Sequence, residues 1–297
     1  MRGKARALAQ RIRTGIRSAI VSARSRGRAF KPVKVFTFVD FRTDFLFYQA
    51  KSLERFLREE FEFTVFDNTP PERAELGLEI RDICRRLGLR YQPVLKQRHD
   101  TANYAHAQAI EWAWHTVIRR ERWDFALILD FDMFLVAPFS LAEYMEKWDL
   151  AGMPQSRDDG KRALEYLWPG LMVLRKTLPD QRRMSFMCDV IDGIPVDVGG
   201  SLFRYLESHA GLRVGKMRNT GHISRAAGNL GLLPFTEGYT EGFNLDFIER
   251  TFIHYGAGSN WDRRAAEYHR QKTEFVFKMV DEAVRSSHEA EVLPSCR

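Results

Sequence analysis

The sequence of 297 residues lacks most of the signatures that assign a protein to a class at sight. No apolar run approaches the roughly 20 residues of a transmembrane helix, so no membrane-spanning segment is predicted. Neither a Walker A loop nor the dinucleotide-binding glycine fingerprint occurs. The cysteines are few, scattered and without metal-ligand spacing: Cys84, Cys188 and Cys296. They predict reduced thiols in a cytosol-like compartment.

Acidic residues are missing from the first 34 positions, which carry eleven Lys or Arg side chains. Subtracting these eleven charges from the net charge of +7 leaves about −4 for residues 35–297. Residues 35–297, the body of the protein, are therefore mildly acidic on balance, and no nucleic-acid surface is expected on them. Within these first positions, apolar residues recur at every fourth residue: Leu8, Ile12, Ile16 and Ile20. A row of arginines lies on the opposite side of the predicted helix. This pattern is typical of a basic amphipathic helix on an anionic membrane surface.

We therefore predict that residues 1–31 form an arm that holds a cytoplasmic protein at the periphery of a membrane. A solvated, partly disordered tail and an Arg-rich organelle transit peptide are the alternatives. Residues 32–270 would form the main domain, and residues 271–297 a C-terminal helix and tail.

The body of the sequence alternates between β-rich runs and helical patterns. Strands are predicted at 33–39, 63–68, 91–95, 125–129, 171–176 and 252–255, and helices at 45–60, 72–88 and 102–121. Alternation of this kind indicates βαβ units, and therefore an α/β fold with a largely parallel sheet.

Two aspartates interrupt the otherwise apolar run ALILDFDMFLV (126–136). Asp130 and Asp132 stand two residues apart, so in an extended chain they share one side. They follow a predicted parallel strand, and open α/β sheets bind ligands at the carboxyl ends of their strands. Two neighbouring carboxylates repel each other, and a divalent cation would remove that cost and bridge the oxygens of a diphosphate. The alternative is a pair that caps the turn before Pro138.

Around these aspartates the sequence resembles a known family. FALILDFDMFLVAPFSL (125–141) is similar to the DxD region of GT-A-fold glycosyltransferases, which use nucleotide-sugar donors. FTFVDFR (36–42) resembles a first strand that delivers Asp40 to the nucleotide, and FTVFDNTP (63–70) a second strand whose terminal acid, Asp67, contacts the base. YLWPGLMVLRK (166–176) resembles a later strand in which Gly170 lets the sugar approach. The resemblance covers residues 33–262 and implies a Rossmann-like GT-A fold with a mixed, mostly parallel central sheet flanked by helices.

FIHYGAGSNW (252–261) resembles a carboxyl-terminal segment with His, Gly and Trp that some families of this fold contain. The resemblance implies that His254 completes a site for Mn²⁺ (or Mg²⁺) with Asp130 and Asp132. A hydrogen-bonded core histidine is the alternative. Gly256 and Gly258 would bring backbone N–H groups close to phosphate. No family within the fold is assigned, because Trp168-Pro169-Gly170 and Asn260-Trp261 depart from the motifs of one retaining branch.

Other residues are candidates for the substrates. Asp197 could act as general base on the acceptor hydroxyl, or cap a helix over SLFRYLESH (201–209). Glu237 and Glu241 are the rival bases. Asn103 and His106 open the helix at 102–121 and could meet the donor. The tryptophans expected either to stack on sugar rings or to pack in the core are Trp168 and Trp261.

These features predict a metal-dependent glycosyltransferase of hexosyltransferase type in glycan or glycolipid synthesis. It would move a sugar from a nucleotide-diphosphate donor to a glycan or lipid-linked acceptor. One alternative is a haloacid-dehalogenase-type phosphohydrolase, with Asp130 as nucleophile and Asp132 as acid/base. Phe134 stands where that family has Thr or Val, and its second acid pair is represented only by Asp158-Asp159 in a polar loop. The other alternative is a non-catalytic nucleotide-sugar-binding module.

Overall fold

The computed structural model describes residues 33–95, 101–222, 242–256 and 264–292. The predicted arm, the rival bases Glu237 and Glu241, and the predicted site residues Gly258 and Trp261 lie outside the described residues. The chain divides into two compact units. The first contains the chain up to Phe47, Glu59–Phe131 and Leu141–Lys216, and the second contains Tyr48–Arg58, Asp132–Ser140 and the chain from Met217. The division predicted at residues 31 and 270 stays a prediction.

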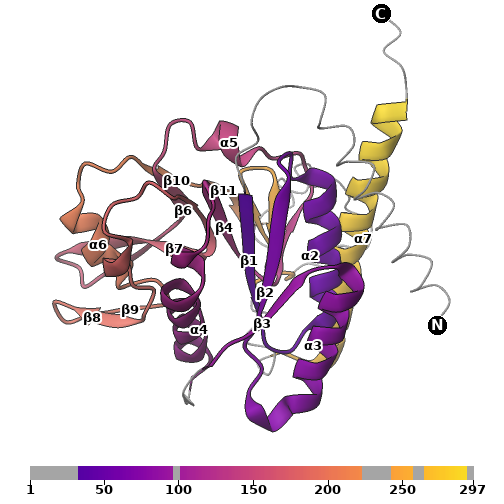
Figure 1. Cartoon of the computed structure of the whole chain (residues 1–297), viewed down its shortest axis with the longest axis horizontal. Coiled ribbons are helices and arrows are strands. Elements are labelled where there is room, and N and C mark those ends of the chain that lie inside the picture. The colour runs from indigo at the N-terminus through magenta and orange to yellow at the C-terminus, as the bar shows by residue number, and fades with distance from the viewer. Residues whose placement is uncertain (1–32, 96–100, 223–241, 257–263, 293–297) are drawn as a thin grey trace, which may run out of the picture. The chain divides into compact units, whose positions relative to one another are not determined.

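The first unit is built on a seven-stranded sheet with the strand order β10-β6-β7-β4-β1-β2-β3 (Figure 1). Its strands are β1 (Val33–Val39), β2 (Phe61–Asp67), β3 (Arg90–Pro93), β4 (Phe125–Asp130), β6 (Leu150–Asp158), β7 (Ala163–Arg175) and β10 (Val214–Lys216). Neighbours pair in parallel except on the two sides of β7, so β7 alone runs against the other six. The predicted fold class, an α/β Rossmann-like fold with a mixed, mostly parallel sheet flanked by helices, is confirmed. A separate hairpin consists of β8 (Asp189–Ile191) and β9 (Ile194–Val196).

Helices cover this sheet because its central strands, β1 and β4, are buried along almost their whole length. The helices of this unit are α3 (Ala74–Leu87), α4 (Ala102–Thr116), α5 (Leu141–Tyr144) and α6 (Leu202–Ser208), with 3₁₀ turns at Pro71–Arg73, Ile118–Arg120 and Gln181–Arg183. Phe36 and Phe38 of β1, which alternate with residues of the other face, pack in one core cluster with Ile110 of α4. Helix α3 packs against β2 and β3, and it ends at Gly88, whose left-handed φ of 72° suits glycine.

The second unit contains a four-stranded antiparallel sheet with the order β11-β12-β13-β5. Its strands are β5 (Met133–Leu135), β11 (Asn219–His222), β12 (Asp246–Ile248) and β13 (Phe252–His254). A tight turn joins β12 to β13, with Glu249 and Arg250 both at positive φ. Turns of this kind match the twist of a hairpin, and the resulting register places Asp246 directly opposite His254.

Helix α2 (Thr43–Phe56) begins in the first unit and continues in the second, which also holds α7 (Ala266–Val292). Within the second unit the ring of Tyr48 stacks on Phe277, with centroids 3.7 Å apart, and Lys51 forms an ion pair with Asp281. The ring of Phe134, on β5, meets Phe277 edge-on. Among the described residues, no helix combines the length and the apolar character needed to cross a membrane.

Two predicted helices are too long, each for a local reason. The helix predicted at 45–60 ends at Phe56, because Leu57 bridges to Phe139 and the Arg58 N–H donates to the Phe139 carbonyl at 3.0 Å. The helix predicted at 102–121 ends at Thr116, because Val117 leaves the helical region with φ −122° and ψ −66°. The strand predicted at 171–176 is the last part of the longer β7.

Candidate metal centre

Three acidic residues gather at the carboxyl edge of the parallel strands. Asp130 is the last residue of β4, Asp67 is the last residue of β2, and Asp40 follows β1, which lies between them. The register pairs Phe38 with Asp130 and Val39 with Asp67, so the strands end level. This is the edge at which open α/β sheets place ligands, as predicted for all three.

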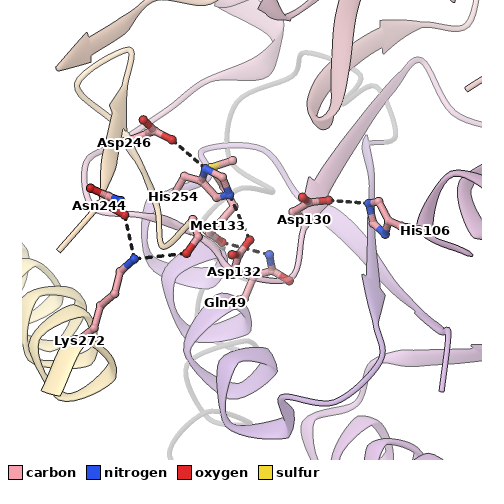
Figure 2. A network of polar contacts seen from close by, with 10 residues as sticks. Gln49, His106, Asp130, Asp132, Met133, Asn244, Asp246, His254 and Lys272 are labelled. Atoms are coloured by element: carbon pink, nitrogen blue, oxygen red, sulfur yellow. Dashed lines mark hydrogen bonds and ion pairs between the residues drawn. The ribbon is translucent and has the colours of Figure 1, made fainter. Parts of the chain in front are cut away.

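Asp130 is oriented by a histidine of the first unit. The Nε2 atom of His106, on α4, lies 3.0 Å from Asp130 Oδ1 and donates to it (Figure 2). His106 in turn meets the ring of Phe38 edge-on, with centroids 6.0 Å apart. This hydrogen bond to one carboxylate oxygen orients the side chain of Asp130. His106 therefore contacts a predicted metal ligand.

Asp132 contacts a different histidine, which belongs to the second unit. Asp132 is only 3% exposed, and its Oδ1 lies 3.4 Å from His254 Nε2. The other ring nitrogen, Nδ1, lies 3.0 Å from Asp246 Oδ2 (Figure 2). The imidazole therefore lies between two carboxylates, one at each nitrogen. Both interpretations of His254 from the sequence, a metal ligand and a hydrogen-bonded core histidine, agree with these contacts.

The electrostatics follow from this geometry. Burial acts to lower the pKa of His254, but the charges and hydrogen bonds of Asp132 and Asp246 outweigh it and raise the pKa to about 10. Without a bound metal, the imidazole is therefore protonated at neutral pH. A cation would take the place of the proton at Nε2, since a metal-bound imidazole must be deprotonated at the ligating nitrogen.

The donor set fits a divalent cation. Asp130 and Asp132 are kept close by the backbone, since only Phe131 separates them. One candidate ligand atom from each of Asp130, Asp132 and His254 lies within 4.8 Å of the other two. Two carboxylates and one imidazole are a mixed oxygen and nitrogen set, which suits Mn²⁺; Mg²⁺ prefers oxygen alone. The residues present therefore fit the predicted metal.

Buried polar contacts of the second unit hold the strands that carry these ligands. Gln49 Nε2, on α2, donates to the Met133 carbonyl at 3.0 Å, directly after Asp132. The Tyr255 N–H donates to the Asp132 carbonyl at 2.9 Å, which joins the two ligand segments. These bonds hold the backbone that directly follows Asp132 and His254, so the ligand positions are set by the fold.

A buried lysine lies beside the same segment. Lys272 of α7 is 1% exposed, and its Nζ donates to the carbonyls of Asn244 at 2.8 Å and Gly256 at 3.2 Å (Figure 2). Burial lowers the pKa of Lys272 to about 8, although the charges of Asp132 and Asp246 act in the opposite direction. Gly256, predicted to approach phosphate, has a left-handed φ of 69° and is fixed by this contact.

Asp67, predicted to contact the nucleotide base, already shapes its own turn. Its Oδ1 accepts the Thr69 N–H at 2.8 Å, and its Oδ2 accepts the Tyr91 hydroxyl at 2.6 Å. A Cβ atom at Gly77 would lie 2.9 Å from the same Oδ2, so the glycine makes room for the carboxylate. Asp67 keeps lone pairs for a further donor, because a carboxylate accepts about four hydrogen bonds.

Asp197, the predicted base, lies in a polar cluster of the first unit. Its Oδ1 accepts from Asn103 Nδ2 at 3.0 Å and from the Val198 N–H at 2.8 Å, and Arg157 lies 3.6 Å from its Oδ2. The structure thus brings together two residues predicted separately, Asn103 and Asp197. Helix α6 begins at Leu202 after Ser201 at the N-cap, so the alternative role of Asp197 as a helix cap is wrong.

The two predicted residues on β7 contact each other. A Cβ atom at Gly170 would overlap the indole ring of Trp168, so the space beside the glycine is filled by that ring. Gly170 therefore serves close packing of Trp168 in this structure. The approach of a sugar at Gly170, which the resemblance implied, stays a prediction, as does stacking of a sugar on Trp168.

Sequence reasoning missed Asp246, Lys272, Gln49 and Arg157. The hairpin that pairs Asp246 with His254 has no turn signal in the sequence, because its turn residues at positive φ, Glu249 and Arg250, are not the Gly, Asn or Asp that typically mark such a turn. Gln49 and Lys272 have no sequence signal either, because each reaches the site from a helix distant in the sequence.

Comparison with known proteins identifies no family. No protein-family description matches the sequence, and no curated protein matches it. Solved structures do match in three dimensions, among them the mannosyltransferase PcManGT from Pyrobaculum calidifontis in complex with GDP-Man and Mn²⁺. That match has 12% identity and a TM-score of 0.41, and it covers 71% of this chain and 66% of the mannosyltransferase chain. A likeness this weak establishes neither a family nor an activity.

Proposed function

We propose that the protein is a metal-dependent glycosyltransferase that moves a sugar, of hexose type, from a nucleotide-diphosphate donor to an acceptor hydroxyl in glycan or glycolipid synthesis. One observation carries the proposal: Asp130, Asp132 and His254 offer ligand atoms within 4.8 Å of one another, and Asp130 ends a parallel strand. The order of the DxD, glycine and histidine segments, which resembles GT-A-fold glycosyltransferases, supports the same activity.

Different residues would bind the metal, the donor and the acceptor. Asp130, Asp132 and His254 would hold Mn²⁺ or Mg²⁺, which when bound neutralises charge on the departing diphosphate. Asp67 would accept from the nucleotide base, and Asp40 lies at the same edge of the sheet. Asp197, held by Asn103, would orient or deprotonate the acceptor hydroxyl. The acceptor is proposed to be a glycan or a lipid-linked glycan, with the basic arm as the contact to an anionic membrane from the cytoplasmic side.

The rival phosphohydrolase chemistry gains no support from its second acid pair. Asp158 accepts the Gly160 N–H at 3.1 Å, and Asp159 accepts the N–H groups of Lys161 and Arg162, each at 2.9 Å. These carboxylates therefore shape the exposed turn between β6 and β7. The aspartates at the end of β4 have no acid pair of the phosphohydrolase kind in this loop.

A thermal-shift panel of nucleoside diphosphates with Mn²⁺ or EDTA, followed by a turnover assay, tests the proposal. Ligand at a hundredfold excess over Kd stabilises the native state by about 2.7 kcal/mol, which a melting curve resolves. We expect stabilisation that requires Mn²⁺, and release of nucleoside diphosphate from the matching nucleotide sugar. Asp130→Asn and Asp132→Asn should lose both, whereas the control Asp281→Asn, which alters a surface ion pair with Lys51, should keep both.

Three results would contradict the proposal in different ways. Release of inorganic phosphate from phosphate esters would indicate the phosphohydrolase. Metal-dependent nucleotide binding without turnover of any nucleotide sugar would indicate the non-catalytic module. Near wild-type turnover in both aspartate variants would remove the metal centre from the mechanism.

A further inference from the structure

We propose that Asp246 is a positioning residue for the metal: its carboxylate holds the imidazole of His254 so that Nε2 is the ligating nitrogen, and this makes the centre selective for Mn²⁺ over Mg²⁺. The inference rests on the proposed function, because it assumes that His254 binds the metal. It assigns a role to an acid that lies outside the DxD and histidine motifs.

The hairpin places Asp246 where such a residue has to lie. Asp246 and His254 stand opposite each other on β12 and β13, and the distance from Asp246 Oδ2 to His254 Nδ1 is 3.0 Å. A carboxylate only accepts, so Nδ1 carries the proton and donates. With a metal in place of its proton, Nε2 then presents its lone pair toward Asp132, 3.4 Å away.

Asp246 is itself anchored from the next strand. Its second oxygen, Oδ1, accepts from Asn219 Nδ2 of β11 at 2.8 Å. The contacts form one line across three adjacent strands of the sheet, from Asn219 through Asp246 to His254. Both carboxylate oxygens have a fixed partner, so the imidazole can neither rotate nor exchange its two nitrogens without breaking a charge-assisted hydrogen bond.

A bond of this kind has a specific consequence for metal choice. A carboxylate behind a ligating histidine raises the basicity of the imidazole and fixes its tautomer, and loss of such a partner typically costs about 10–100-fold in metal affinity. Mn²⁺ accepts a nitrogen ligand, whereas Mg²⁺ is held mainly by oxygen. Removing Asp246 should therefore weaken Mn²⁺ binding strongly and Mg²⁺ binding little.

The experiment measures metal binding by the full-length protein, with Mn²⁺ and Mg²⁺ themselves as the probes. Calorimetric titration gives both affinities for wild type, Asp246→Asn, Asp246→Ala and Asn219→Ala, with Asp281→Asn as control. We expect Mn²⁺ affinity to fall about 10–100-fold in the alanine variant, less in the near-isosteric asparagine variant, and less again for Asn219→Ala. The ratio of Mn²⁺ to Mg²⁺ affinity should fall in the same order, and the control should match wild type.

Pulsed electron paramagnetic resonance of bound Mn²⁺ supplies a readout that a purely structural role would not change. Wild type should show coupling to one directly bound ¹⁴N nucleus, absent in His254→Ala and weakened or altered in Asp246→Ala. If Asp246→Ala does not fold, Asp246→Asn and the wild-type spectrum still decide the point.

The two hypotheses fail separately. No Mn²⁺ binding by wild type would overturn the proposed function itself. Mn²⁺ binding by wild type without ¹⁴N coupling, or with unchanged affinity, metal ratio and spectrum in both Asp246 variants, would overturn the role of Asp246 alone.

Discussion

In the metal-free protein, the substitution Asp132→Asn removes one of the two carboxylates that flank the imidazole of His254. The two charges lie 3.4 Å apart, and Asp132 is 3% exposed. At an effective dielectric of about 20, an ion pair at that distance is worth about 5 kcal/mol. Asn retains a hydrogen-bonding side chain, and His254 keeps Asp246 and can release its proton. We therefore expect a net loss of about 1–3 kcal/mol in the free energy of unfolding.

The loss in the free energy of unfolding should depend on pH, and the pKa of His254 determines whether it grows or shrinks as the pH rises. That pKa is raised to about 10 in the folded protein, from about 6.5 in the unfolded chain. The stabilisation is therefore fully present below about pH 6.5 and is lost as the pH rises through about 10. The difference between wild type and Asp132→Asn should accordingly be largest below pH 6.5 and should narrow toward pH 10.

Urea denaturation in EDTA measures this difference by linear extrapolation. Asp130→Asn is the matched comparison, because its partner His106 has a more exposed side chain, at 21% against 14% for His254. We expect a loss below about 1 kcal/mol there. An Asp132→Asn variant as stable as wild type at pH 6, or a difference that widens with pH, would refute the reasoning.

Further predictions concern separate parts of the protein. Burial raises the pKa of Glu54 to about 7, so the charged carboxylate opposes folding above that pH. After allowance for solvent screening, Glu54→Gln should stabilise the protein by about 1 kcal/mol at pH 8 and by almost nothing at pH 4.5. The melting temperature at the two pH values measures this difference. Binding of Mn²⁺ at pH 7 should release about one proton, from His254, which calorimetry in buffers of different ionisation enthalpy detects. Asp67→Asn should raise the KM for the donor more than it lowers kcat, because base recognition is mostly uniform binding, and an unchanged KM would remove Asp67 from the donor site. Deletion of residues 1–31 should abolish salt-sensitive co-sedimentation with anionic vesicles and leave donor hydrolysis intact; full-length protein that stays in the supernatant at low salt would exclude the membrane role.

The sequence was sufficient for the parts of the fold that depend on local pattern. Apolar runs predicted β1, β2 and β4, and the position of Asp130 at the end of β4 followed from the polar residue that interrupts the run. Gly88 predicted the end of α3, because few other residues adopt its left-handed conformation. These signals lie within one element and do not require knowledge of its neighbours.

Contacts between distant elements were not predictable in the same way. The sequence alone predicts that Asp130 and Asp132 repel each other. The structure gives each aspartate a histidine partner, His106 and His254 respectively, and the expected loss of stability in Asp132→Asn depends on this contact. Helix ends shifted for a similar reason, since the end of α2 depends on the pairing of Leu57 with Phe139.

The central claim is that Asp130, Asp132 and His254 together bind a divalent cation, and anomalous X-ray diffraction from crystals grown with Mn²⁺ and a nucleoside diphosphate tests it most directly. Data collected on the two sides of the manganese absorption edge locate the ion independently of the protein coordinates. We predict one strong anomalous peak within about 2.0–2.4 Å of a carboxylate oxygen of each aspartate and of His254 Nε2, with diphosphate oxygens completing the coordination. A peak at any other group of residues, or density for nucleotide at the carboxyl edge of β4 with no manganese beside these three side chains, would contradict the claim.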